Sequence, residues 1–321
     1  MPVRTILRSG ICALLAALIL IVATPEARAQ SCSISVTPLN FGPVDVIANA
    51  PVDATATATV TCTAVAPVRV CIHIGPGGAG ATNAANRNLA SGGNLLRYGL
   101  YSNPARSSPW GSETWSSGGA SSIEVVTPNL VSTESISRTI YGRVHGGQQT
   151  SAPLAYTSVF SGADIFIRYG LVSLLLGCDL LTTSSPGSFT VTATVPPTCR
   201  IATSDMNFGT AGVLTGFLDA SSALTPTCTN GTSYTIGLNG GLSGTANPAM
   251  RRMSQGAETI TYGLYRDAAR VQPFGNTIGV DTIASTGTGL AQARTVYGRI
   301  GPQATPSPGT YTDTIVATVT Y

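Results

Sequence analysis

The chain has 321 residues, with 17 Lys and Arg against 14 Asp and Glu, so its formal net charge is +3 at pH 7. The sequence contains no lysine, and such a weakly charged surface argues against nucleic acid or an anionic membrane as a partner. The 36 glycines, many Thr and Ser residues and few charges are typical of an all-β extracellular protein.

Residues 1–29 have the pattern of a secretory signal peptide. Arg4 and Arg8 form the positive start, Ile11 to Ala23 the apolar stretch, and Ala27 to Ala29 a small-x-small cleavage site. The alternative is an N-terminal membrane anchor, but the apolar stretch is too short to span a bilayer. We therefore expect export through the periplasm to the cell surface, without stable membrane insertion.

Six cysteines follow this segment, and an even number in an exported chain predicts three disulfides. They are Cys32, Cys62, Cys71, Cys178, Cys199 and Cys228. Two pairs with nearly equal spacing, Cys32–Cys62 and Cys199–Cys228, occupy matching places in an internal repeat. Cys71 and Cys178 have no counterparts in the second copy and are left to pair with each other. No CxxC occurs and there are two histidines, so neither a metal nor another cofactor is expected.

The two copies share three blocks of sequence. LNFG at 39–42 matches MNFG at 206–209, YGLY at 98–101 matches YGLY at 262–265, and RTIYGRV at 138–144 matches RTVYGRI at 294–300. Repetition over this length indicates tandem domains, which we place at residues 30–195 and 196–321. Arginines that recur in both copies, Arg106 with Arg270 and Arg143 with Arg299, are expected to be structural.

Short alternating or β-branched segments separated by Gly, Pro, Asn and Ser predict a β-sandwich in each copy. The expected strands of the first copy are Ala54–Cys62, Val68–Ile74, Tyr98–Tyr101, Ile136–Val144 and Asp164–Tyr169. The Gly- and Asn-rich tract from Gly75 to Asn94 is expected to run over the surface.

Between the copies lies an alternating strand, Ser188–Val195, with apolar side chains at Phe189, Val191, Ala193 and Val195. The second copy ends with Tyr311–Tyr321, whose end matches the Asp164–Tyr169 strand, and no strand follows it in the sequence. We therefore expect the second sandwich to lack its final strand. Such a sandwich exposes its apolar core and unpaired backbone groups to another chain.

The succession of cysteine, NFG, YGLY, YGR and the terminal YTDTIVATVTY resembles the spore coat U domain, found in secreted bacterial proteins and in subunits of archaic chaperone–usher pili. The resemblance implies two immunoglobulin-like sandwiches, the second incomplete. In the family, a periplasmic chaperone caps such subunits, an outer-membrane usher assembles them, and an adjacent pilin subunit donates the missing strand. The pairing residues would be Tyr311, Ile315, Ala317, Val319 and Tyr321.

On this resemblance, Ser188–Val195 fills its own first domain, and no strand precedes Cys32 that could be donated. The chain would accept a strand but give none, which indicates a two-domain tip adhesin for surface attachment and biofilm formation. The first domain would be adhesin-like and the second pilin-like.

The connection Gly170–Gly187 contains the most apolar stretch after residues 1–29, with Leu171, Val172, Leu174, Leu175 and Leu176. If Ser188–Val195 is antiparallel to Asp164–Tyr169, this stretch lies at the outer end of the domain and can contact an abiotic or host surface. Alternatively, the apolar stretch prolongs the preceding strand and is buried in the core. If Ser188–Val195 is instead parallel, the apolar stretch does not lie at the outer end.

The two tryptophans of the sequence call for different interpretations. Trp115 has no counterpart in the second copy and is a second candidate for surface contact. Trp110 aligns with Phe274 and is expected to be structural.

Two other classes of function are an enzyme and a secreted coat protein. An enzyme is disfavoured because the two copies share no histidine and no closely spaced pair of carboxylates. A secreted coat protein that assembles without a pilus shares the same fold, and composition does not separate it from a pilus subunit.

Overall fold

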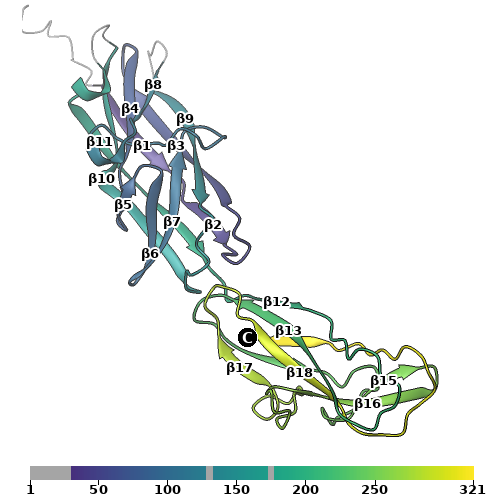
Figure 1. Cartoon of the computed structure of the whole chain (residues 1–321). Helices are drawn as coiled ribbons and strands as arrows, with labels where there is room; N and C mark the ends of the chain where they lie inside the picture. Colours follow the sequence, from purple (N-terminus) through teal and green to yellow (C-terminus); the bar gives the residue numbers. More distant parts are fainter. Residues whose placement is uncertain (1–29, 128–132, 173–176) are drawn as a thin grey trace, which may run out of the picture.

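The computed structural model describes residues 30–127, 133–172 and 177–321. This part of the chain is built almost entirely of β-strands, in two domains that follow one another along the chain (Figure 1). The all-β fold class expected from the sequence is thereby confirmed. Within the described ranges, no helix has the length and apolar character needed to cross a membrane.

The first domain is an 11-stranded sheet that folds over a single core. Its strands are β1 (Ser31–Val36), β2 (Leu39–Pro43), β3 (Val52–Thr63), β4 (Val68–Ile74), β5 (Ala81–Asn83), β6 (Asn86–Ser91), β7 (Asn94–Tyr101), β8 (Ile123–Val126), β9 (Thr133–Val144), β10 (Ala155–Leu171) and β11 (Thr183–Thr194). The hydrogen-bonded order is β1-β3-β9-β7-β6-β10-β11-β2, and β4 pairs with β10 and β8. Two short 3-10 turns, η1 (Ser116–Gly118) and η2 (Cys178–Leu180), lie in the connections.

The tract from Gly75 to Asn94 differs from the surface excursion expected from its composition. It contains β5 and β6, and β6 pairs with β7 and β10 within the sheet. Arg87 on β6 is fully buried and donates hydrogen bonds to the carbonyls of Gly75, Ile74 and Trp110 at 2.7–2.9 Å. Because these carbonyls satisfy the guanidinium, a polar segment is able to occupy an interior position.

The second domain is a smaller sandwich of two sheets. Its strands are β12 (Cys199–Thr203), β13 (Leu218–Cys228), β14 (Ser233–Leu238), β15 (Arg251–Gln255), β16 (Glu258–Tyr265), β17 (Ile283–Thr286), β18 (Arg294–Ile300) and β19 (Ala317–Thr320). One sheet has the order β12-β13-β18-β16-β15 and the other the order β17-β14-β19.

The recurring arginines make the same contacts in both domains. Arg143 forms a bidentate pair with Asp53, with N–O distances of 2.7 and 2.8 Å. Arg299 forms the same pair with Asp219 at the same two distances. These pairs tie neighbouring strands of each sheet together, which agrees with a structural role for the recurring arginines.

Candidate functional site

The first domain shows how a complete sandwich of this type is closed. Its β11 pairs antiparallel with β10, where Phe189 faces Phe160, and parallel with β2, where Val191 faces Leu39. The four apolar residues predicted for this strand, Phe189, Val191, Ala193 and Val195, are between 0% and 5% exposed. The rings of Phe160 and Phe189 stack with their centroids 4.4 Å apart. The strand therefore completes both the backbone ladder and the core of its own domain.

Among the strands described for residues 196–321, none is equivalent to β11. In the first domain β10 pairs with β4 through Ile165 and Ile74, and in the second β19 pairs with β14 through Ala317 and Leu238. By this register, β19 takes the place of the outer half of β10. Within the described ranges, β19 is the last strand of its sheet, so its other edge has no paired strand.

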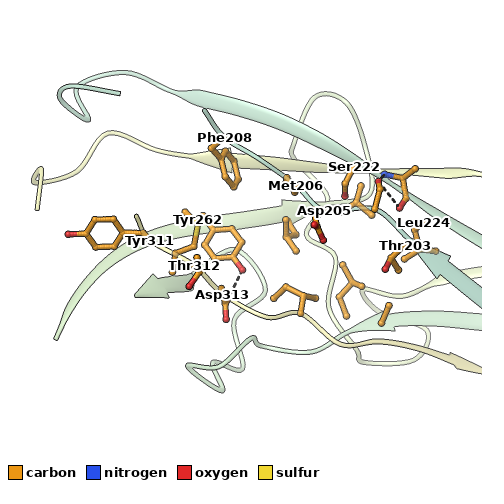
Figure 2. Close-up of a pocket in the computed structure, with 18 residues that line it drawn as sticks. Thr203, Asp205, Met206, Phe208, Ser222, Leu224, Tyr262, Tyr311, Thr312 and Asp313 are labelled. Atoms are coloured by element: carbon orange, nitrogen blue, oxygen red, sulfur yellow. Dashed lines mark hydrogen bonds between the residues drawn. The ribbon is translucent and has the colours of Figure 1, made fainter. Parts of the chain in front are cut away.

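An open groove of about 300 Å³ lies where β11 would run. Met206 and Phe208 line one side, and Tyr311 lies across from them (Figure 2). Ile315 and Ala317, which follow Tyr311 in the chain, line the groove as well. Behind them, the groove reaches the core through a set of apolar side chains. These are Leu224, Leu238, Met253, Leu264 and Val296. The groove is therefore an opening into the hydrophobic core of the second domain.

Both walls of the groove lack the strand structure of their counterparts. Met206 and Phe208 correspond to Leu39 and Phe41 of β2, yet residues 204–210 form no strand. Leu39 and Phe41 are 0% and 6% exposed, whereas Met206 and Phe208 are half-buried. Residues 311–316 contain no strand apart from an isolated bridge between Thr312 and Ser254. The walls miss the backbone partner that β11 provides to β2 and β10 in the first domain.

The expected strand Tyr311–Tyr321 is therefore much shorter than the sequence indicated. Its regular part is Ala317–Thr320, where Val319 pairs with Ile236 of β14. Tyr311, Ile315 and Ala317 line the groove, but Val319 packs against the core within the sheet. Tyr321 is 57% exposed.

A carboxylate stands among the apolar residues of the groove. Asp313 accepts hydrogen bonds from the Tyr262 hydroxyl and the Leu242 backbone N–H, each at 2.7 Å. Desolvation, followed by the hydrogen bond to Asp313, raises the pKa of Tyr262 well above its usual range, so this hydroxyl remains a donor. Asp313 thus fixes the loop at Leu242 against the groove wall. Gly241 packs so closely on Asp313 that a Cβ there would lie 2.1 Å from its Oδ2 atom.

Taken together, these features suit the binding of an extended peptide. The groove offers alternating apolar contacts, and its two walls have backbone groups without strand partners. A strand bound as β11 is bound would run antiparallel to residues 311–317 and parallel to residues 206–209. Addition of a strand at such an edge combines backbone hydrogen bonds with side-chain burial in alternate positions.

The six cysteines are joined in three pairs. Sulfur–sulfur distances are 2.03 Å for Cys32–Cys62, 1.98 Å for Cys71–Cys178 and 2.05 Å for Cys199–Cys228. The first and third hold adjacent strands, β1 to β3 and β12 to β13. The second ties β4 to η2, in the connection between β10 and β11.

That connection is shorter than expected, because β10 reaches Leu171 and β11 begins at Thr183. The two strands are antiparallel, so their turn lies at the end of the domain away from the domain junction (Figure 1). Leu171 and Val172 are 52% and 43% exposed. Leu180, which the sequence did not single out, is 54% exposed in the connection between β10 and β11. Leu174, Leu175 and Leu176 lie outside the described residues.

Trp115 does not belong to that outer end. Its ring lies 5.2 Å from the Arg87 guanidinium carbon and is half-buried. Arg87 bonds to the Ile74 end of β4, whereas Leu171 pairs with Val68 at the other end. The length of β4 separates these ends by about 20 Å, so Trp115 and Leu171 belong to different surfaces.

Trp110 has a structural role. It is 1% exposed, and its indole N–H donates to the Ile72 carbonyl at 2.9 Å. Phe274, which aligns with it in the second copy, is fully buried as well.

The sequence did not assign Met206, Phe208, Asp313 and Tyr262 to the site. A signal for the first two was present, because MNFG repeats LNFG and Leu39 borders β11 in the first domain. Asp313 carried no comparable signal, since its counterpart in the first domain is the neutral Ser158.

Comparison with known proteins identifies two copies of one domain. The family model of the Spore Coat Protein U domain matches residues 18–162 and 185–318, and the second match begins inside β11. Protein U of Myxococcus xanthus is 36% identical over 105 residues, which is 31% of this chain. The match spans 58% of the length of Protein U.

A solved structure of a pilus subunit complex shows a similar fold. The CsuC–CsuE chaperone–tip adhesion subunit pre-assembly complex, from the archaic chaperone–usher Csu pili of Acinetobacter baumannii, matches with a TM-score of 0.52 at 15% identity. That match covers 91% of this chain and 100% of the other. The CupB6 tip adhesin of Pseudomonas aeruginosa matches at 9% identity with a TM-score of 0.35, over 91% of this chain and 94% of that one.

Proposed function

Because the chain belongs to the spore coat protein U domain family, with two copies of the domain, we propose that it is the tip subunit of a chaperone–usher pilus. The observation that carries the proposal is the groove of the second domain. This groove corresponds to the position that β11 fills in the first domain. In the described structure, no strand lies between the two walls of the groove. A strand from the adjacent pilin subunit would fill it.

The place at the tip follows from the use of β11. This strand precedes the second domain, but it is buried in the first domain and bonded on both sides. It is not free to enter the groove of another subunit. A subunit that accepts a strand and keeps its own occupies the end of a fibre.

Before assembly, the groove would expose the core of the second domain to water. A periplasmic chaperone would fill it with a strand of its own, and an outer-membrane usher would exchange that strand for the pilin strand. Each apolar side chain buried in the groove contributes about 1.5–3 kcal/mol. Alternating apolar residues on the incoming strand would therefore stabilise the second domain strongly.

The first domain would make contact with an abiotic or host surface and so promote biofilm formation. Leu171, Val172 and Leu180 present apolar area at the end of the domain away from the groove. Many fibres attached in parallel would multiply a modest contribution from each contact.

The experiment supplies the missing strand in the same chain. The mature protein is extended after Tyr321 by a short Gly/Asn linker and a copy of residues 183–195. Tyr321 matches Tyr169, which pairs with Thr183, so the added strand starts in register. We expect the melting transition of the second domain to rise by about 10 °C or more.

A matched extension with Asp at the two positions copied from Phe189 and Val191 is the control, and it should leave the transition unchanged. An equal response to both extensions would contradict the proposed groove. Immunogold labelling of assembled pili tests the position separately. Labels distributed along the fibre shaft, instead of at one end, would overturn the tip assignment.

A further inference from the structure

A regular array of hydroxyl groups covers one outer face of the first domain. In β1, β3 and β9 most residues that alternate with the core positions are Ser or Thr. The exceptions, Asp53 on β3 and Tyr141 and Arg143 on β9, lie toward one end of these strands. Strand register aligns Ser33 with Thr61 and Thr61 with Ser135 in one row. We call this array of outward residues the hydroxyl face.

The next row has the same composition, with Ser35, Thr59 and Ser137 in register. The serines of both rows are exposed, and the threonines of the central strand are half-buried. Rows are about 6.8 Å apart along the strands, and neighbouring strands are about 4.8 Å apart. The hydroxyl groups therefore repeat at fixed distances in two directions.

The hydroxyl face is held in place before any ligand binds. Thr61 lies 2.8 Å from Ser135 and Thr59 lies 2.9 Å from Ser137, oxygen to oxygen. The Cys32–Cys62 disulfide pins β1 to β3 directly beside the row of Ser33. Threonine is also stiff about χ1, so ordering these side chains on binding costs little entropy.

Binding capacity remains after these internal bonds. Each hydroxyl has one donor and two acceptor positions, and the bond within a pair uses one of each. The six residues of the two rows bear no charge. A complementary partner is therefore neutral, flat, and able to donate and accept hydrogen bonds at regular intervals.

The second domain shows that this face is not a requirement of the fold. Cys199 and Cys228 match Cys32 and Cys62, and the adjacent row consists of Arg200, Thr227 and Ala291. The central threonine is kept, while the flanking hydroxyls are replaced by a charged residue and a methyl group. In the next row, Ala202 pairs with Thr225, so a methyl group again stands where the first domain has the hydroxyl of Ser35.

From this geometry we infer that the hydroxyl face of the first domain binds a flat, uncharged polysaccharide whose repeating hydroxyl groups lie against its rows. The six residues include no aromatic side chain, so recognition depends on many parallel hydrogen bonds and not on stacking of single sugars. This contact is separate from the apolar outer end of the domain and does not depend on the groove.

Co-sedimentation of the mature protein with microcrystalline cellulose tests this inference. The test variant combines Thr59→Val, Thr61→Val, Ser135→Ala and Ser137→Ala, which removes hydroxyls and keeps good strand formers at the central positions. The control variant, Thr225→Val with Thr227→Val, makes the matching central change in the second domain. We expect at least a tenfold loss of apparent affinity in the test variant and none in the control. Melting temperatures of all three proteins show that folding is retained.

Two further measurements separate this face from other modes of attachment. Binding should persist in 1 M NaCl, because no charge takes part. A Leu171→Ser, Val172→Ser variant should bind cellulose as the wild type does. The inference is overturned if the wild type does not sediment with cellulose or if the test variant binds as well as the wild type. It is also overturned if 1 M NaCl, or the Leu171→Ser, Val172→Ser variant, abolishes binding.

Discussion

The burial of Phe189 in β11 leads to a quantitative prediction about the closed domain. Phe189 is 5% exposed, and its ring stacks on Phe160 at 4.4 Å between centroids. Replacing Phe189 by Ala leaves a cavity between β10 and β2, and such a change in a core typically costs about 3–5 kcal/mol. For a domain of this size, each kcal/mol corresponds to about 2–4 °C, so the melting temperature should fall by about 6–20 °C.

Differential scanning calorimetry of the mature protein can measure this change, because each domain gives its own transition. Thr190→Ala is the matched control, since Thr190 neighbours Phe189 on the same strand but points away from the core and is half-exposed. It should cost less than about 1 kcal/mol. The transition of the second domain should stay in place in both variants. If Phe189→Ala shifts the first domain no more than Thr190→Ala does, β11 does not close this domain, and the comparison with the open groove fails.

Two further predictions concern the first domain. Burial lowers the pKa of His73 from 6.5 to about 4, so the folded state stays neutral where the unfolded chain takes up a proton. The free energy of unfolding should therefore decrease by up to about 3 kcal/mol as the pH falls from 6.5 to 4. Urea titrations of a His73→Gln variant should show no such dependence of the unfolding free energy on pH. An unchanged pH dependence in this variant would assign the effect to other groups. Replacing both Cys71 and Cys178 by Ala opens a link across 107 residues and should cost about 2–4 kcal/mol in the same titrations. It should also reduce attachment through the outer end near Leu171, and full attachment by this variant would argue against a role for that end.

The repeat made much of the fold predictable. Matching blocks placed the equivalent strands, and matched cysteine spacing grouped Cys32 with Cys62 and Cys199 with Cys228. The alternation of Phe189, Val191, Ala193 and Val195 indicated a strand with one buried face. These signals were reliable because alternation in a strand directly reflects which face meets the core.

Other features depend on contacts that periodicity does not encode. The strand β6 was missed because one of its two buried residues is Arg87, whose burial depends on carbonyls brought together by the fold. The strand expected at Tyr311–Tyr321 is too long, because regular structure in residues 311–316 requires a neighbouring strand. Asp313 was missed because its partner Tyr262 lies on another strand. Each of these is decided by tertiary hydrogen bonding.

The direction of β11 has a mechanical consequence for a fibre under tension. In the proposed tip position, a pull from the second domain would reach β11 at its last residue, Thr194, and the outer end of the same domain would be held at the attachment surface. The load then acts along the axis of β11, parallel to β2 and antiparallel to β10. Because β11 begins at Thr183, just after Leu180, the covalent backbone of this one strand would carry the load between the linker and the outer end. A domain loaded in this way would resist detachment by flow, because its sheet would not be peeled open from an edge.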